Sequence, residues 1–104
     1  MARFILMATS DAQPGQEADF TRWYDEVHIP QVCSIPGFVS CRRFQQSVHS
    51  PSQTPAHYLA VYEVETDNPQ AVMAELLRRA STGELARSCA LDPTNAKLWL
   101  YEAN

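Results

Sequence analysis

The sequence is short of positive charge and has no long apolar run. Eight Lys and Arg residues stand against twelve Asp and Glu residues, so the formal net charge is −4. Nucleic acids and anionic membranes bind clustered positive charge, so we expect neither as a partner. The N-terminal apolar run covers only residues 4–8, which is too short for a signal peptide or a membrane span. These absences predict a cytoplasmic protein.

Motifs that hold metals or cofactors are also missing. The three cysteines, Cys33, Cys41 and Cys89, include no CxxC pair, and the three histidines lack the spacing of metal ligands. Reduced thiols fit this pattern better than a disulfide framework or a zinc site. There is no glycine-rich phosphate loop, no GxSxG and no HExxH. The sequence therefore predicts no metal and no cofactor.

What is present is the composition of one small globular domain. Apolar residues make up 45% of the 104 residues and charged residues 19%. A chain of this mass buries about two-thirds of its extended surface, which is enough for one core but not for two. We therefore expect a single domain over residues 1–104.

Hydrophobic periodicity and turn residues predict the order β-α-β-β-α-β. We expect strands at 3–9, 38–48, 57–66 and 96–102, a helix at 16–28 ended by Pro30, a second helix from Asn68-Pro69, and a short helical piece at 83–90 broken by Asp92-Pro93. The second helix is predicted to bury Val72, Met73, Leu76, Leu77 and Ala80. This order indicates a ferredoxin-like α+β fold, with a four-stranded antiparallel sheet and both helices on one face.

The strands are apolar on both faces, which is unusual for a sheet covered by helices on one side only. In the last strand, Leu98 and Leu100 oppose Trp99 and Tyr101, and the other strands show the same pattern. A second apolar face needs a cover, because monomers rarely expose large apolar patches. We therefore predict a two-fold homodimer, sheet on sheet, with an uncovered monomer as the alternative.

His28 is the most informative single residue. The first helix carries Phe20, Trp23, Tyr24 and Val27 at helical spacing, and His28 falls on the same apolar stripe. A histidine in an apolar pocket tends to stay neutral, and a neutral imidazole can act as a general base. The alternative is a histidine at the edge of the core that caps a backbone carbonyl.

Aromatic residues and two adjacent arginines add candidate binding groups. Buried tyrosine hydroxyls need partners and can hold a substrate oxygen; Tyr62, central in its strand, is favoured over Tyr58. Arg42 and Arg43 point to opposite faces of their strand. One of them can clamp a carboxylate or phenolate of a ligand; the alternative is a bulge or an ion pair with Glu63 or Glu65.

Several motifs together resemble one known superfamily. They are the segment FTRWYDEVHIP at 20–30, the sequence IPGF at 35–38, Arg42-Arg43-Phe44, and YLAVYE at 58–63. They are similar to the dimeric α/β-barrel superfamily, and in particular to its EthD-like members, whose pattern is WY-x-x-x-H-x-P followed by PGF. The resemblance implies a dimeric α/β barrel. It also implies proton transfer by a pocket histidine and a tyrosine where members lack a cofactor.

In this sequence that histidine matches His28, and the tyrosine matches Tyr62 first and Tyr24 second. The leading hypothesis is a cofactor-independent lyase or isomerase/cyclase that acts on a small apolar, aromatic or phenolic catabolite. An arginine would orient an anionic group, and the pocket-shaping residues would be Trp23, Phe44, Trp99 and Tyr101. The alternatives are a non-catalytic small-molecule-binding accessory protein and a cofactor-free quinol-type monooxygenase.

Overall fold

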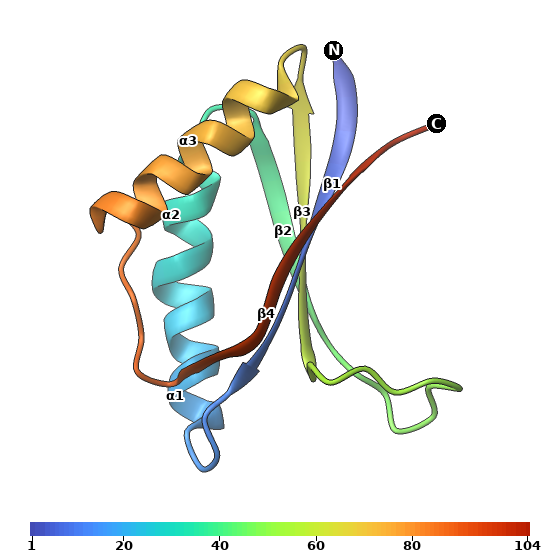
Figure 1. Ribbon diagram of the computed structural model, residues 1–104, viewed down its shortest axis with the longest axis vertical. Helices are drawn as coiled ribbons and strands as arrows, with labels where there is room; N and C mark the ends of the chain where they lie inside the picture. The colour runs from blue at the N-terminus through green and yellow to red at the C-terminus, as the bar shows by residue number, and fades with distance from the viewer.

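The computed structural model describes residues 1–104 and has the predicted ferredoxin-like α+β architecture (Figure 1). Its elements are β1 (Ala2–Ala12), α1 (Glu17–Trp23), the π-helix η1 (Tyr24–His28), α2 (Ile29–Cys33), β2 (Phe38–Gln45), β3 (Tyr58–Thr66), α3 (Pro69–Thr82) and β4 (Leu91–Glu102). None of the helices has the length and apolar character needed to cross a membrane.

The four strands form one antiparallel sheet in the order β2-β3-β1-β4. All the helices lie on the same side of this sheet in Figure 1. The core fills the space between the two layers. From β1 and β3 it takes the alternate side chains that face the helices, which are Phe4, Leu6, Ala8, Ala60, Tyr62 and Val64. The predicted fold class is therefore confirmed.

The first helix runs further than the sequence predicts. Pro30 was expected to end it, but α2 continues to Cys33, with Pro30 inside its first turn. Proline lacks the amide hydrogen that continues the hydrogen-bond pattern of an α-helix. The π-helical turn η1 comes directly before it and resets the hydrogen-bond pattern, so that α1, η1 and α2 form one continuous segment.

Helix α3 begins as predicted but buries less of its surface. The Asn68 side chain accepts a hydrogen bond from the Ala71 amide at 3.1 Å, which is a normal N-cap. Val72 and Leu76 are buried, whereas Leu77 and Ala80 are exposed, so two of the five predicted core positions are wrong. A single helix buries only a narrow stripe against a sheet, and these two residues lie outside it.

The predicted helical piece at 83–90 is also wrong. Gly83 has a φ of 83° and ends α3 in the left-handed conformation, which stops the helical hydrogen-bond pattern. The chain then runs without regular structure to β4, and only Leu85 and Ala90 are buried along it.

Two strands are longer than predicted and two are shorter, β3 by the single residue at position 57. Strand β1 continues to Ala12, and β2 ends at Gln45 rather than 48. Strand β4 begins at Leu91, so Asp92-Pro93 does not precede the strand but lies within it. Pro93 is tolerated because β4 is an edge strand and because its pairing with β1 shifts register between Thr9 and Asp11.

No helix covers the second face of the sheet, and only the loop between β2 and β3 lies against one end of it. It carries Ile5, Phe44, Trp99 and Tyr101, of which Trp99 is 46% and Tyr101 53% exposed. The chain exposes 6736 Å² in all, whereas a compact monomer of this mass exposes roughly 5,900 Å². The predicted second apolar face is therefore present, and we refer to it below as the outer face.

Candidate functional site

A cavity of about 310 Å³ lies between the first helix and the strands β1 and β4. Its lining residues are Ala8, Thr9, Ser10, Trp23, Tyr24, His28, Leu91, Ala96, Lys97 and Leu98. Three of the nine predicted site residues, Trp23, Tyr24 and His28, therefore meet in one place. The cavity opens where β1 and β4 lose their regular register, because the ladder between them is interrupted beyond Thr9.

The π-helical turn determines how these three rings meet. In an α-helix, residues five apart are rotated by about 140° and cannot stack. In η1 the Ile29 amide donates to the Tyr24 carbonyl five residues earlier, which brings positions five apart onto one face. The His28 ring therefore stacks on Trp23, with centroids 4.7 Å apart and an angle of 26° between the planes. Tyr24 meets the same imidazole edge-on at 4.9 Å.

The His28 imidazole is held neutral by its surroundings. Burial lowers its pKa to about 4, because a charged ring loses its hydration there. Its Nδ1 atom is buried and has no hydrogen-bond partner. The alternative that His28 caps a carbonyl through this atom is therefore not supported. An unpaired buried ring nitrogen is costly, at about 1–3 kcal/mol, and such atoms call for an explanation by function or by a bound group.

The two candidate tyrosines differ in access. Tyr24 lines the cavity, and burial raises its pKa to about 12, so that its hydroxyl keeps its proton as a hydrogen-bond donor. Tyr62, the first choice from sequence, does not line the cavity. Its hydroxyl is buried in the core beside Tyr24 and Cys41 without a hydrogen-bond partner, and burial raises its pKa far above the usual range. The geometry therefore favours Tyr24 as the group that meets a substrate.

Trp23 is anchored on its far side by the segment between α3 and β4. The indole Nε1 donates to the Ala86 carbonyl at 3.2 Å. The Ala86 amide donates in turn to the Gln31 side chain at 2.8 Å, which fixes the segment to α2. The stacked pair of Trp23 and His28 is thus held from the side of this segment.

The two arginines separate to opposite faces, as predicted, but neither lines the cavity. Arg43 faces the helices, where its guanidinium lies 3.0 Å from an Asp25 carboxylate oxygen and 4.9 Å from the centre of the Tyr24 ring. Its side chain is only 16% exposed, and the pairing satisfies its charge. Its partner is Asp25 rather than the expected Glu63 or Glu65. Arg42 faces the outer side and lies over Phe44 at 5.8 Å.

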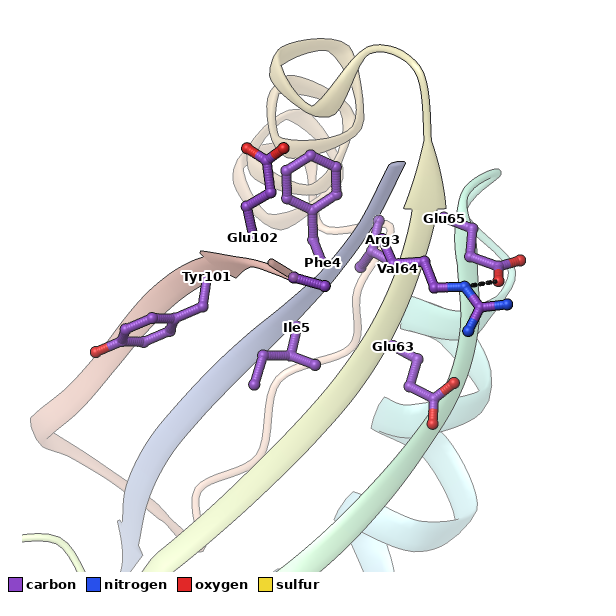
Figure 2. A pocket seen from close by; sticks show the side chains of 9 residues that line it. Arg3, Phe4, Ile5, Glu63, Val64, Glu65, Tyr101 and Glu102 are labelled. Carbon is purple, nitrogen blue, oxygen red and sulfur yellow. Dashed lines mark ion pairs between the residues drawn. The ribbon is translucent and has the colours of Figure 1, made fainter. Parts of the chain in front are cut away.

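Three further predicted pocket residues lie on the outer face. Phe44, Trp99 and Tyr101 alternate with residues that face the helices, so the sheet separates them from His28. A hollow at one end of this face includes Tyr101 and Ile5, which come from neighbouring strands (Figure 2). The Arg3 guanidinium is 3.1 Å from Glu65 there, and no histidine or cysteine lines this hollow. We therefore place the candidate active site on the helix side.

Sequence reasoning missed Ser10 and Leu98 as lining residues. Ser10 is 5% exposed and follows Phe4, Leu6 and Ala8 on the helix-facing side of β1. The alternation of side chains in the first strand would have indicated Ser10 if the predicted strand had continued beyond residue 9. Leu98 pairs with Ala8 and shares its face. The sequence could show that alternation but not which face carries the helices.

No cluster of three or more His, Cys, Asp or Glu side chains is arranged to hold a metal ion. The thiols of Cys33, Cys41 and Cys89 are free. Burial raises the pKa of Cys33 and raises that of Cys41 to about 11, so that neither is a good nucleophile at neutral pH. The groups that can do chemistry in the cavity are therefore the neutral His28 imidazole and the Tyr24 hydroxyl.

Comparisons with known proteins support the fold. No family profile and no curated protein matches this chain. Among solved structures, it is similar to an ethyl tert-butyl ether D (EthD) family protein from Bacillus halodurans, with 15% identity, coverage of 100% of both chains and a TM-score of 0.62. A proposed monooxygenase from Shewanella loihica is 18% identical, with coverage of 100% of this chain and 97% of that one and a TM-score of 0.61.

The heme-degrading protein MhuD from Mycobacterium tuberculosis, whose structure holds two hemes in its active site, is also similar. It is 18% identical, with coverage of 96% of this chain and 94% of that one and a TM-score of 0.60. At these identities the comparisons establish the fold and not the reaction. The chain therefore has the ferredoxin-like fold shared by EthD-family and monooxygenase-like proteins, as the sequence motifs predict.

Proposed function

We propose that this protein is an enzyme that moves a proton on a small aromatic or phenolic substrate, with His28 as the general acid/base and without a cofactor. The observation that carries this proposal is the neutral His28 ring in an aromatic-lined cavity, with Nδ1 unpaired. The cavity lies at the lower end of the roughly 300–1,000 Å³ range of small-molecule sites, which favours a compact ligand.

In this mechanism the substrate ring packs among Trp23, Leu91 and Leu98, all of which line the cavity. His28 takes a proton from an acidic C–H or O–H of the substrate. Tyr24 donates a hydrogen bond to the oxygen on which negative charge develops, because its raised pKa keeps it protonated. The imidazolium then returns the proton to another atom of the substrate or to a leaving group. Isomerisation or cyclisation follows in the first case and elimination in the second.

A cofactor-free monooxygenase is the second candidate, and the structural similarity to a proposed monooxygenase favours it. The same deprotonation by His28 would produce a phenolate or quinolate that is electron-rich enough to react with molecular oxygen. Oxygen uptake by purified protein with a quinol separates the two candidates, because isomerases and lyases consume none. An accessory protein that only binds its ligand gives a third pattern. In that case His28→Gln would keep the ligand affinity, and neither this variant nor the wild type would turn the ligand over.

We also propose that the outer face is the seam of a homodimer and that the chain acts as one cytoplasmic domain. The exposed side chains Ile5, Phe44, Trp99 and Tyr101 supply the apolar surface for such a seam. Stable interfaces bury about 800 Å² per partner, and the surface of this chain exceeds that of a compact monomer by a similar amount. The free cysteines are consistent with a reducing compartment.

The first test is a thermal-shift panel of phenols, aromatic acids, lactones, quinols and haem. A ligand at 100 times its dissociation constant stabilises the fold by about 2.7 kcal/mol, which is several degrees for a domain of this size. Hits in the phenol, aromatic acid, lactone or quinol class, followed by turnover that is lost in His28→Ala, are the expected result. A shift with haem alone, or with no compound, would contradict the proposal.

A further inference from the structure

The edge strand β4 carries two leucines that face the helix side yet lie in the open. Leu98 pairs with Ala8 and Leu100 with Leu6, and both β1 residues belong to the buried core. Directly paired residues of an antiparallel sheet share a face, so Leu98 and Leu100 point to the helix side. Nevertheless Leu98 is 53% and Leu100 39% exposed. The strand order places β4 at the edge of the sheet, next to β1.

The cavity reaches the first of these two leucines. Leu98 is one of its lining residues, on the strand wall across from the first helix. Leu100 lies two residues further along the same face of β4, about 7 Å beyond. The two side chains therefore extend the cavity as an open apolar shelf that begins beside the catalytic candidates and ends at the edge of the sheet.

A second copy of the chain on the outer face would not cover this shelf. Trp99 and Tyr101, which alternate with the two leucines, point to that face. The homodimer proposed above would therefore bury Trp99 and Tyr101 and leave Leu98 and Leu100 open. Because Leu98 belongs to both the cavity lining and the shelf, the best-matched occupant of the shelf is the part of a substrate that protrudes from the cavity.

We infer that the substrate is an aromatic or phenolic ring that bears an unbranched apolar chain, with the ring beside His28 and Trp23 and the chain along Leu98 and Leu100. This inference rests on the proposed function for the position of the ring. It adds a chain-binding subsite and makes Leu100 a specificity residue. The head group is recognised by the polar groups of the cavity, and the chain is recognised only by apolar contact.

The test is a series of para-alkylphenols with methyl, propyl and hexyl chains, whose dissociation constants are measured by isothermal titration calorimetry. Each methylene that reaches the shelf should tighten binding by about fourfold in the wild type. Leu100→Thr removes apolar surface and introduces a β-branched residue that strands accept, so it should weaken hexylphenol binding by about fivefold, while methylphenol stays within twofold. The matched control is Leu77→Thr, since Leu77 is an exposed leucine of α3 that does not line the cavity.

The outcomes separate this inference from the function on which it rests. Equal affinity of the wild type for methylphenol and hexylphenol overturns the shelf. The shelf is also overturned if affinity rises with chain length to the same extent in Leu100→Thr and in Leu77→Thr. The wild-type series needs no variant, so its result does not depend on whether Leu100→Thr folds. Binding of hexylphenol but not methylphenol, with the Leu100 dependence, supports the shelf and contradicts the phenol-binding cavity. No binding of any member contradicts both.

Discussion

The two faces of the sheet are similar in composition and differ in what covers them. The helix side has a packed core and a cavity lined by a neutral histidine, whereas the outer face presents aromatic and aliphatic side chains to solvent. Arg42 and Arg43 show the difference within two residues. Arg43 is enclosed by an aspartate and aromatic rings, and Arg42 lies on the open face. The two faces therefore differ in burial rather than in residue type. The buried helix side is the candidate active site, and the exposed outer face is the candidate dimer interface.

Removing the base should have the largest effect on the helix side. His28→Gln keeps a similar shape but cannot take up a proton, so turnover of the substrate class found in the thermal-shift panel should fall by about 10²–10⁴-fold. Affinity for the same ligand should change by only a few-fold. Steady-state kinetics and calorimetry measure the two quantities. Turnover within threefold of the wild type would remove His28 from the mechanism.

A charge on the outer face should break the proposed dimer and leave the cavity intact. Trp99→Glu removes a large apolar side chain and places a carboxylate at the seam twice, once per protomer. The dimer should weaken by roughly a hundredfold or more. Light scattering coupled to size-exclusion chromatography measures this. The control is Leu77→Glu, which places the same charge on α3. A wild type that is monomeric at all concentrations would contradict the seam.

Acid should destabilise the fold through His28. Its pKa is about 4 when folded, against an ordinary value of about 6.5, so that below pH 6.5 the unfolded chain takes up a proton that the native ring does not. Stability is therefore lost as the pH falls from 6.5 to 4, by up to about 3 kcal/mol from this group. Urea unfolding at several pH values measures the loss. The slope contributed by His28 should disappear in His28→Gln, and an identical slope in both proteins would contradict a buried neutral ring.

Replacement of the two arginines should give the smallest difference between the two faces, measured as a loss of stability. Arg43→Met breaks a half-buried ion pair and a cation–π contact, and we expect a loss of about 1–2 kcal/mol. Arg42→Met acts on the open face and should cost less than about 0.5 kcal/mol. Urea unfolding of the two variants makes the comparison. Equal losses of unfolding free energy in the two variants would mean that enclosure of Arg43 on the helix side adds nothing to stability.

The fold was predictable because its signals are local. The i, i+3, i+4 spacing of Phe20, Trp23 and Tyr24, the Asn68-Pro69 helix start and the alternation in the strands each specify an element without reference to the others. The errors fell where one segment depends on the segment before it. Pro30 stays helical after the π-helical turn, and residues 83–90 leave the helical conformation after Gly83, with only Leu85 and Ala90 buried.

The site was predictable only in part, for a geometric reason. The helical stripe predicted that Trp23, Tyr24 and His28 lie on the apolar side of one helix, and all three line the cavity. The stacking of residues five apart depends on a π-helical turn, which the sequence alone did not indicate. For strand residues such as Phe44 and Trp99, the sequence shows which residues share a face of the sheet. It does not show which face the helices cover, since two apolar faces look alike in sequence.

The most direct test of the proposed chemistry is the titration of His28 by nuclear magnetic resonance with isotope-labelled histidine. The signal that is lost in His28→Gln is assigned to His28. We predict that His28 stays neutral down to a pKa of about 4 and that a bound phenol perturbs its ring signals. A His28 that titrates near 6.5, with no response to any ligand of the panel, would contradict the claim that it is a buried neutral base facing a binding cavity.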